Sequence, residues 1–316
     1  MARALWLTGP EAAELRETPP GEGEVEIRTL FSGISRGTEA LVASGRVPGS
    51  ERERMRCPLQ EGDFPFPVKY GYAAVGEVVA GPADLRERMV FVLHPHQDRL
   101  AVEPAMAVAL PEGVPPERAI LAANMETALN VVWDAGVAPG DRVAVVGAGV
   151  VGALVGYLAA RMPGTEVWLV DVKPERAALA EGFGCRFAEP GAVPAECDVV
   201  VHASASAEGL SVAIAAAGLE ARVVEASWYG EGVVPVPLGG VFHSRRLHLV
   251  SSQVGRLPPE RAVRWSHRRR LGMALSLLAE PALEALVSGE TSFDALPEVY
   301  HAILADSATL CHRVRY

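Results

Sequence analysis

The stretch from Arg142 to Gly152, which reads RVAVVGAGVVG, decides the fold. Its first five residues predict a buried strand, and its last six fit the pattern G-x-G-x-x-G. An apolar helix pattern follows, and a second strand pattern over 166–170 ends at Asp171. This order of strand, glycine turn, helix, strand and acidic residue predicts the first half of a doubly wound, dinucleotide-binding α/β sheet.

The three glycines of the motif have separate physical roles. Gly147 permits the tight turn, Gly149 lets a pyrophosphate approach the backbone, and Gly152 lets the helix pack closely on the strand. Val150 and Val151 lie in the first helical turn, where unpaired N–H groups bind an anion. We therefore predict cofactor contacts at all five residues.

Asp171 bears on the choice of cofactor. It lies 22 residues after Gly149, where a carboxylate accepts hydrogen bonds from a ribose diol and repels a 2′-phosphate. The sequence thus favours NAD, while the nearby cations Lys173 and Arg176 leave NADP open. The alternative for the whole motif is a glycine-rich packing turn that binds no ligand.

Strand and helix patterns alternate through the middle of the chain. The predicted helices are 124–135, 150–161, 174–182 and 208–217, and the predicted strands are 142–146, 166–170, 198–202, 221–226 and 247–251. Such alternation predicts a parallel sheet with helices on both faces. Residues 1–123 instead carry short β-type runs, among them 25–30, 73–79 and 89–93, and predict a small barrel-like, β-rich domain.

Composition excludes several classes of protein. The 316 residues suggest two domains, and a hydrophobic content of 49% excludes disorder. The net charge of −10 argues against a nucleic-acid partner, because binding nucleic acid requires a basic face on the protein.

The uncharged run 143–160 has the length of a membrane span, but its strand-like start and its glycines favour a buried strand and helix. Four scattered cysteines and the lack of a signal-peptide pattern favour a cytoplasmic location.

Further polar residues follow predicted strands, at the edge where a doubly wound sheet binds its ligands. His202 and Ser204 end and follow the strand 198–202, and Ser252 follows the strand 247–251. We predict cofactor contacts for both serines. His202 is interpreted as a hydrogen-bonded loop histidine, with a place beside the ribose as the alternative.

Several strings resemble the medium-chain dehydrogenase/reductase superfamily of zinc-type alcohol dehydrogenases and their relatives. The strings are SGISRGTE (32–39), GYAAVG (71–76), APGD (138–141) and the glycine motif. The resemblance implies a GroES-like domain at 1–123 and 266–316, interrupted by a Rossmann domain at 124–265, and hydride transfer with NAD or NADP. The strings ISRGTE (34–39) and VKYGY (68–72) look most like the branch around bacteriochlorophyllide a dehydrogenase.

The zinc ligands of that superfamily are missing from this chain. Zinc members have Cys where this chain has Ser35 or Arg36, His-Glu where it has Tyr72-Ala73, and a third ligand where it has Ala123 or Asn124. The four-cysteine structural zinc lobe is missing as well. The resemblance therefore predicts a protein without zinc, and it carries a nicotinamide contact over to Thr127.

Without a metal, the reacting oxygen needs a proton donor from the protein. Tyr72 stands where the superfamily has a zinc-ligating His, and it either acts as that donor or fills the vanished metal site. Ser35 and Thr38 add hydroxyls, and Thr38 matches a superfamily position used in proton relay. His96 is a candidate relay or substrate contact, and the alternatives are a metal shared with His94 or local loop hydrogen bonds.

Three charged features have simpler interpretations. Lys69 either lowers the pKa of a neighbouring phenol or is a solvated surface group. The arginines within 261–270 form a solvated helix face or, alternatively, contact an anionic substrate. Glu126 is interpreted as a carboxylate near a helix N-terminus.

These observations lead to one main hypothesis and two alternatives. The main one is an NAD(P)-dependent oxidoreductase of the alcohol dehydrogenase type, which interconverts a small secondary alcohol and a ketone without zinc. The alternatives are a zinc-free quinone or enone reductase and a non-catalytic nucleotide-binding paralogue. The strand 247–251 is expected at a sheet edge, where it predicts a homodimer.

Overall fold

The computed structural model describes all 316 residues, and the chain divides into two units. Unit 1 comprises Met1–Ala123 and Leu271–Tyr316, and unit 2 comprises Asn124–Arg270. The return to unit 1 therefore lies at residue 271 rather than at the predicted residue 266, within helix α8 (His267–Leu277). None of the helices is long and apolar enough to cross a bilayer.

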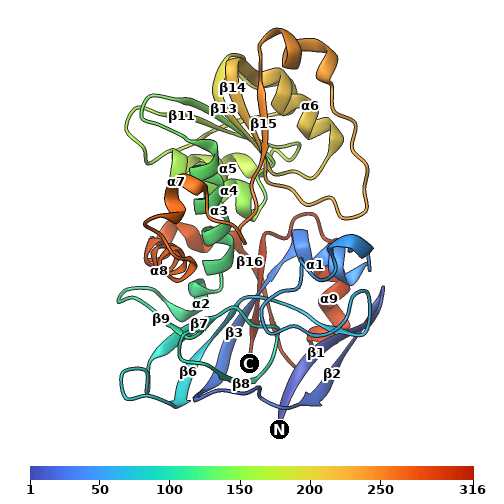
Figure 1. Cartoon of the computed structure of the whole chain (residues 1–316), viewed down its shortest axis with the longest axis vertical. Helices are drawn as coiled ribbons and strands as arrows, with labels where there is room; N and C mark the ends of the chain where they lie inside the picture. The colour runs from blue at the N-terminus through green and yellow to red at the C-terminus, as the bar shows by residue number, and fades with distance from the viewer. The chain divides into compact units, whose positions relative to one another are not determined.

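Unit 2 contains a six-stranded parallel sheet in the order β12-β11-β10-β13-β14-β15 (Figure 1). Its strands are β10 (Arg142–Val146), β11 (Glu166–Val170), β12 (Arg186–Ala188), β13 (Cys197–His202), β14 (Ala217–Glu225) and β15 (His248–Ser251). The chain order reverses between β10 and β13, as in doubly wound sheets. The predicted doubly wound α/β sheet is confirmed.

The helices of unit 2 follow the predicted pattern closely. They are α3 (Ala122–Ala135), α4 (Val150–Ala159), α5 (Arg176–Gly182), α6 (Ala207–Ala216), α7 (Pro259–Ala262) and the first part of α8, with short turns η2 (Pro190–Ala192) and η3 (Leu238–Phe242). Helix α4 packs on β10 and β11, and α6 packs on β10, β13 and β14. Burial of side chains such as Val146, Val200 and Ile214 between the sheet and these helices forms the core of the unit.

Unit 1 contains two sheets. The larger has the order β16-β17-β3-β6-β7-β9 with β8 paired to β3, and the smaller has the order β2-β1-β5-β4. The strands are β1 (Ala2–Gly9), β2 (Ala12–Thr18), β3 (Val25–Ser35), β4 (Glu61–Gly62), β5 (Val68–Lys69), β6 (Ala74–Ala80), β7 (Met89–Val92), β8 (Arg99–Val102), β9 (Val108–Ala109), β16 (Val287–Ser292) and β17 (Cys311–Arg315). The helices are α1 (Arg36–Ala43), α2 (Pro116–Ala119), the remainder of α8 and α9 (Leu296–Ala305), with short turns η1 (Gly49–Glu51) and η4 (Pro281–Leu286).

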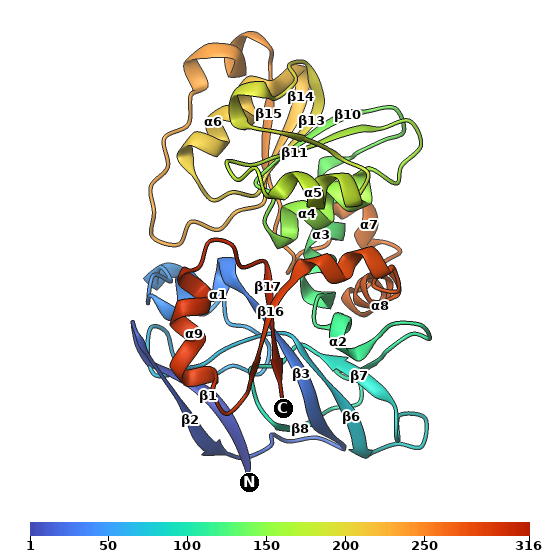
Figure 2. The same cartoon turned by 180° about the vertical axis from the view of Figure 1, so that it is seen from behind.

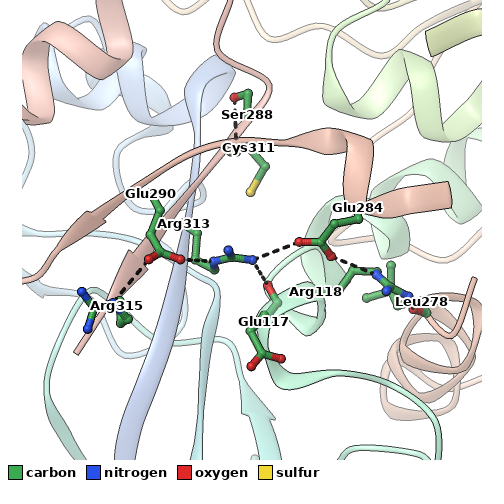
Figure 3. Close-up of polar contacts among 9 residues, drawn as sticks. All are labelled: Glu117, Arg118, Leu278, Glu284, Ser288, Glu290, Cys311, Arg313 and Arg315. Carbon is green, nitrogen blue, oxygen red and sulfur yellow. Dashed lines mark hydrogen bonds and ion pairs between the residues drawn. The ribbon is translucent and has the colours of Figure 1, made fainter. Parts of the chain in front are cut away.

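The C-terminal segment is an integral part of unit 1. Strand β17 pairs antiparallel with β3, and Figure 2 shows the red C-terminal strand beside the blue β3. Arg313 of β17 connects three parts of this segment, because it donates to Glu290 of β16 at 2.6 Å and to Glu284 of the η4 turn at 3.1 Å. Arg118 also donates to Glu284, at 3.2 Å, and so connects α2 to the returning chain (Figure 3).

Candidate active site

The glycine motif forms the turn between β10 and α4. Gly147 has a φ of +105°, and a Cβ there would lie 2.6 Å from the backbone N of Ser204. A Cβ at Gly152 would lie 1.9 Å from the carbonyl oxygen of Gly147, whereas a Cβ at Gly149 would have nothing within 4 Å. The packing of the protein itself therefore requires two of the glycines, and the third leaves the backbone open to a ligand.

Asp171 is tied to the same turn. Its Oδ2 accepts a hydrogen bond from the backbone N of Ala148 at 2.8 Å, and its Oδ1 accepts one from the backbone N of Lys173 at 3.0 Å. The N-terminus of α4 at Gly149 has no side-chain cap, so its first N–H groups are free for an anion. An open backbone at a helix N-terminus with a fixed carboxylate beside it fits a dinucleotide.

The other predicted cofactor contacts in unit 2 lie in different surroundings. Thr127 is half-buried on α3. Ser252 follows β15, and its hydroxyl donates to Asp134 at 2.5 Å, which ties it to α3. The roles of Thr127 and Ser252 in cofactor binding stay predictions.

Ser204 belongs to a polar cluster at the carboxyl ends of β13 and β14. The Oγ of Ser204 lies 2.7 Å from Nε2 of His202, and Nδ1 of His202 lies 2.7 Å from Oε2 of Glu225. Tyr229 donates to the same Oε2 at 3.0 Å. The sequence suggested Tyr229 as a nicotinamide contact or a core aromatic, but it missed Glu225, which lies in the predicted strand 221–226 and ends β14 in the structure.

In unit 1 the structure brings three predicted catalytic residues together. Burial raises the pKa of Tyr72 well above its usual value of 10, and hydrogen bonding with the side chains of Ser35 and Thr38 offsets this only in part. Ser35 ends β3 and Thr38 lies in the first turn of α1, so the junction of these two elements positions both hydroxyls. At neutral pH the phenol of Tyr72 is therefore protonated.

The fourth predicted residue, His96, lies in a separate buried network. Its Nδ1 is 2.7 Å from the Oγ of Ser32, and its Nε2 is 3.1 Å from Oε2 of Glu39. Glu39 is fully buried, and it also accepts hydrogen bonds from Tyr300 at 2.8 Å and from the backbone N of Ser35 at 2.7 Å. Glu39 thus links His96, Tyr300 and the backbone of Ser35 in one buried network.

His94 does not share a site with His96. Its Nδ1 lies 2.9 Å from the carbonyl of Pro95, and burial lowers its pKa to about 3, so the ring is neutral. Across residues 1–316 no group of three or more His, Cys, Asp and Glu side chains is arranged to hold a metal ion. The expectation of a protein without zinc stays a prediction.

Two interpretations of charged residues were wrong. Lys69 is buried, not solvated, and it pairs with Glu61 and donates to Gln97 at 2.8 Å rather than acting on a phenol. Arg270 is also buried, whereas the sequence favoured a solvated helix face. It donates to Glu126 at 3.0 Å, so Glu126 is half of a buried ion pair.

Comparison with known proteins agrees with this fold. The chain is 27% identical to D-xylulose reductase A of Aspergillus oryzae over 71% of its own length. The match covers 66% of the reductase, so the chain spans just under two thirds of that relative. Over its whole length it superposes on L-idonate 5-dehydrogenase of Escherichia coli with a TM-score of 0.79 at 14% identity, covering 98% of that chain. The chain has the medium-chain dehydrogenase/reductase fold. No family model matches it.

This fold confirms the predicted resemblance to the superfamily at the level of architecture. A further solved neighbour, a short chain alcohol dehydrogenase of Escherichia coli CFT073 in complex with NADH, has a TM-score of 0.77 at 16% identity and covers 99% of its chain and 100% of this one. Other neighbours with the same fold hold NADP. The narrower likeness to the bacteriochlorophyllide a dehydrogenase branch stays a prediction.

Proposed function

We propose that the chain is an NAD(P)-dependent oxidoreductase of the alcohol dehydrogenase type, which interconverts a small secondary alcohol and a ketone without catalytic zinc. The observation that carries this proposal is the cluster of Tyr72, Ser35 and Thr38, in which hydroxyls stand at or beside the superfamily's ligand positions. The open glycine turn and the dehydrogenase and reductase relatives support the nicotinamide cofactor.

The residues of unit 1 supply proton transfer in this proposal. When bound, the nicotinamide supplies or accepts the hydride. The protonated phenol of Tyr72 donates its proton to the carbonyl oxygen of a ketone as negative charge develops there. Ser35 and Thr38 orient the phenol through their hydroxyls. Because Tyr72 remains protonated at neutral pH, the arrangement favours ketone reduction over alcohol oxidation, which requires a base.

Binding and turnover experiments test the proposal. NADH and NADPH are titrated by fluorescence, and the protein is then assayed on ketones, secondary alcohols, enones and quinones. We expect tighter binding of NADH, because Asp171 repels a 2′-phosphate, and reduction of ketones. Turnover of enones or quinones alone would replace the alcohol assignment, and cofactor binding without turnover would favour a nucleotide-binding protein.

The metal content is tested separately. We expect far less than one zinc ion per chain in the purified protein, and an unchanged rate after dialysis against EDTA. One tightly held zinc ion per chain would overturn the zinc-free mechanism.

We also propose that the chain forms a homodimer through β15. This strand ends the order of the six-stranded sheet, His248 and Ser251 are exposed, and Leu249 is 37% exposed. An unpaired strand edge offers N–H and C=O groups to a second copy. Light scattering after size exclusion should give twice the mass of one chain, and Leu249→Lys should shift the measured mass toward that of the monomer.

Four free cysteines support a reducing compartment, the cytoplasm.

A further inference from the structure

The polar cluster at the ends of β13 and β14 has the connectivity of a nucleophile, a base and an orienting carboxylate. Ser204 Oγ contacts Nε2 of His202, and the other ring nitrogen contacts Glu225, both at 2.7 Å. His202 is fully buried, whereas Ser204 is exposed. Ser204 therefore lies at the surface of the unit while its histidine partner is shielded.

The protonation state of the cluster follows from Glu225. Burial alone would raise the pKa of Glu225, but hydrogen bonds from His202 and Ser227 hold it below its ordinary value. The carboxylate is therefore ionised at neutral pH and only accepts hydrogen bonds. Nδ1 of His202 consequently donates to Oε2 of Glu225, and Nε2 faces the hydroxyl of Ser204 at 2.7 Å.

The backbone around Ser204 is shaped for this contact. The residue lies in the turn between β13 and α6, and the next residue, Ala205, has a φ of +53°, which L-residues rarely adopt. A Cβ at Gly209 would lie 2.2 Å from Ser204 Oγ and 2.8 Å from Nε2 of His202, so a side chain there would displace the cluster from this arrangement. Ser206 caps α6 and lies 2.9 Å from Ser204 Oγ, which fixes the hydroxyl from a second side.

We propose that Ser204 is a nucleophile for small activated esters, with His202 as its general base and Glu225 as the residue that orients the base. The Oγ forms a bond to the acyl carbon while His202 Nε2 takes the hydroxyl proton. The alcohol or phenol of the ester leaves, takes up that proton, and an acyl-serine remains. A water molecule then attacks the acyl-serine with His202 again as base, and releases the carboxylic acid and the free serine.

A fluorophosphonate tests the nucleophile directly, because phosphonylation of serine releases fluoride and forms a stable adduct. The full chain, freed of cofactor, is incubated with the probe and examined by intact mass and by peptide mapping. We expect one adduct per chain, located on Ser204. Ser204→Ala should abolish the adduct, and Ser211→Ala, which removes an exposed serine of α6 outside the cluster, should leave it unchanged.

Glu225→Gln and His202→Asn test the base. Removing an effective general base lowers rates by about 10²–10⁴-fold, so we expect labelling of Ser204 to slow by at least about 100-fold in His202→Asn. Glu225→Gln removes the carboxylate that orients the base, and it should slow labelling by a similar factor. Thermal unfolding shows whether each variant folds, and Glu225→Gln, which keeps the shape of the side chain, decides the test if His202→Asn is unfolded. Hydrolysis of p-nitrophenyl acetate should decline in parallel.

Two results would overturn the proposal. One is the absence of an adduct on Ser204 in the folded protein, and the other is an equal labelling rate in wild type and Glu225→Gln. Because labelling needs neither a nicotinamide nor Tyr72, its outcome is independent of the oxidoreductase assignment.

Discussion

Replacing Gly149 by Ala separates cofactor binding from folding. The Cβ position of Gly149 has no atom within 4 Å, and its φ of −71° suits any L-residue. A glycine-to-alanine change at a compatible position stabilises the folded state by about 0.4–1 kcal/mol. The new methyl group occupies the space through which a pyrophosphate reaches the backbone. We therefore expect the Kd of NADH to rise at least tenfold, which corresponds to about 1.4 kcal/mol.

Gly152→Ala is the matched control, since it adds the same methyl group three residues further along. Its Cβ would lie 1.9 Å from the carbonyl oxygen of Gly147, a backbone atom that cannot rotate away. Overpacking of this kind costs about 1–3 kcal/mol. A loss of that size lowers Tm by roughly 2–4 °C per kcal/mol.

Thermal unfolding by circular dichroism and titration with NADH read out the two effects. We expect Gly149→Ala to keep or exceed the wild-type Tm while it loses NADH affinity, and Gly152→Ala to lose Tm. If Gly149→Ala bound NADH with the wild-type Kd, a pyrophosphate would not lie over this turn. The assignment of the cofactor site to the glycine motif would then be refuted.

Other perturbations test the remaining sites. Tyr72→Phe should lower kcat for ketone reduction by about 10²–10⁴-fold and leave the Kd of NADH unchanged, and unchanged turnover would reject Tyr72 as the donor. Because burial raises the pKa of Tyr72 above 10, the wild-type rate should stay constant up to about pH 10 in a pH–rate profile. Arg270→Met should lower the free energy of unfolding in urea by about 3–5 kcal/mol, because it leaves Glu126 buried without its partner. Adding Glu126→Leu should restore part of this free energy, and additive losses would argue against direct pairing. Glu225 has a lowered pKa, so the stabilisation from its carboxylate is present above the ordinary value of 4.5 and is lost as pH falls through the folded-state pKa. Below pH 4.5 the free energy of unfolding of wild type should therefore fall more steeply with pH than that of Glu225→Gln, and parallel curves would contradict this.

Unit 2 was predictable because its signals are local. The strands 142–146 and 166–170 have the predicted bounds, since each is a short apolar run closed by a turn or a charged residue. Unit 1 was predictable only in outline. The run 25–30 extends to Ser35 in β3, because the extra residues pair with β17 from the opposite end of the chain. No local pattern contains that pairing.

The proposed catalytic cluster shows the same limit. Tyr72 and Ser35 were found through a resemblance that aligns them with metal ligands, and Thr38 through one that aligns it with a proton-relay position. Glu39 was not recognised as buried, because its partner Tyr300 lies 261 residues away. Lys69 was misjudged for the same reason: the burial of a charge depends on partners that only the folded chain supplies.

The pair of His202 and Glu225 is different, because its signal was present in the sequence. Both residues end strands that a doubly wound order places side by side, and parallel strands bring their carboxyl ends to one edge of the sheet. The observed register pairs His202 directly with Glu225. Polar residues that close neighbouring parallel strands are therefore to be considered as pairs from the outset. At this edge the pair places a ring nitrogen of His202 against Glu225 and the other against the hydroxyl of Ser204, two residues beyond the histidine.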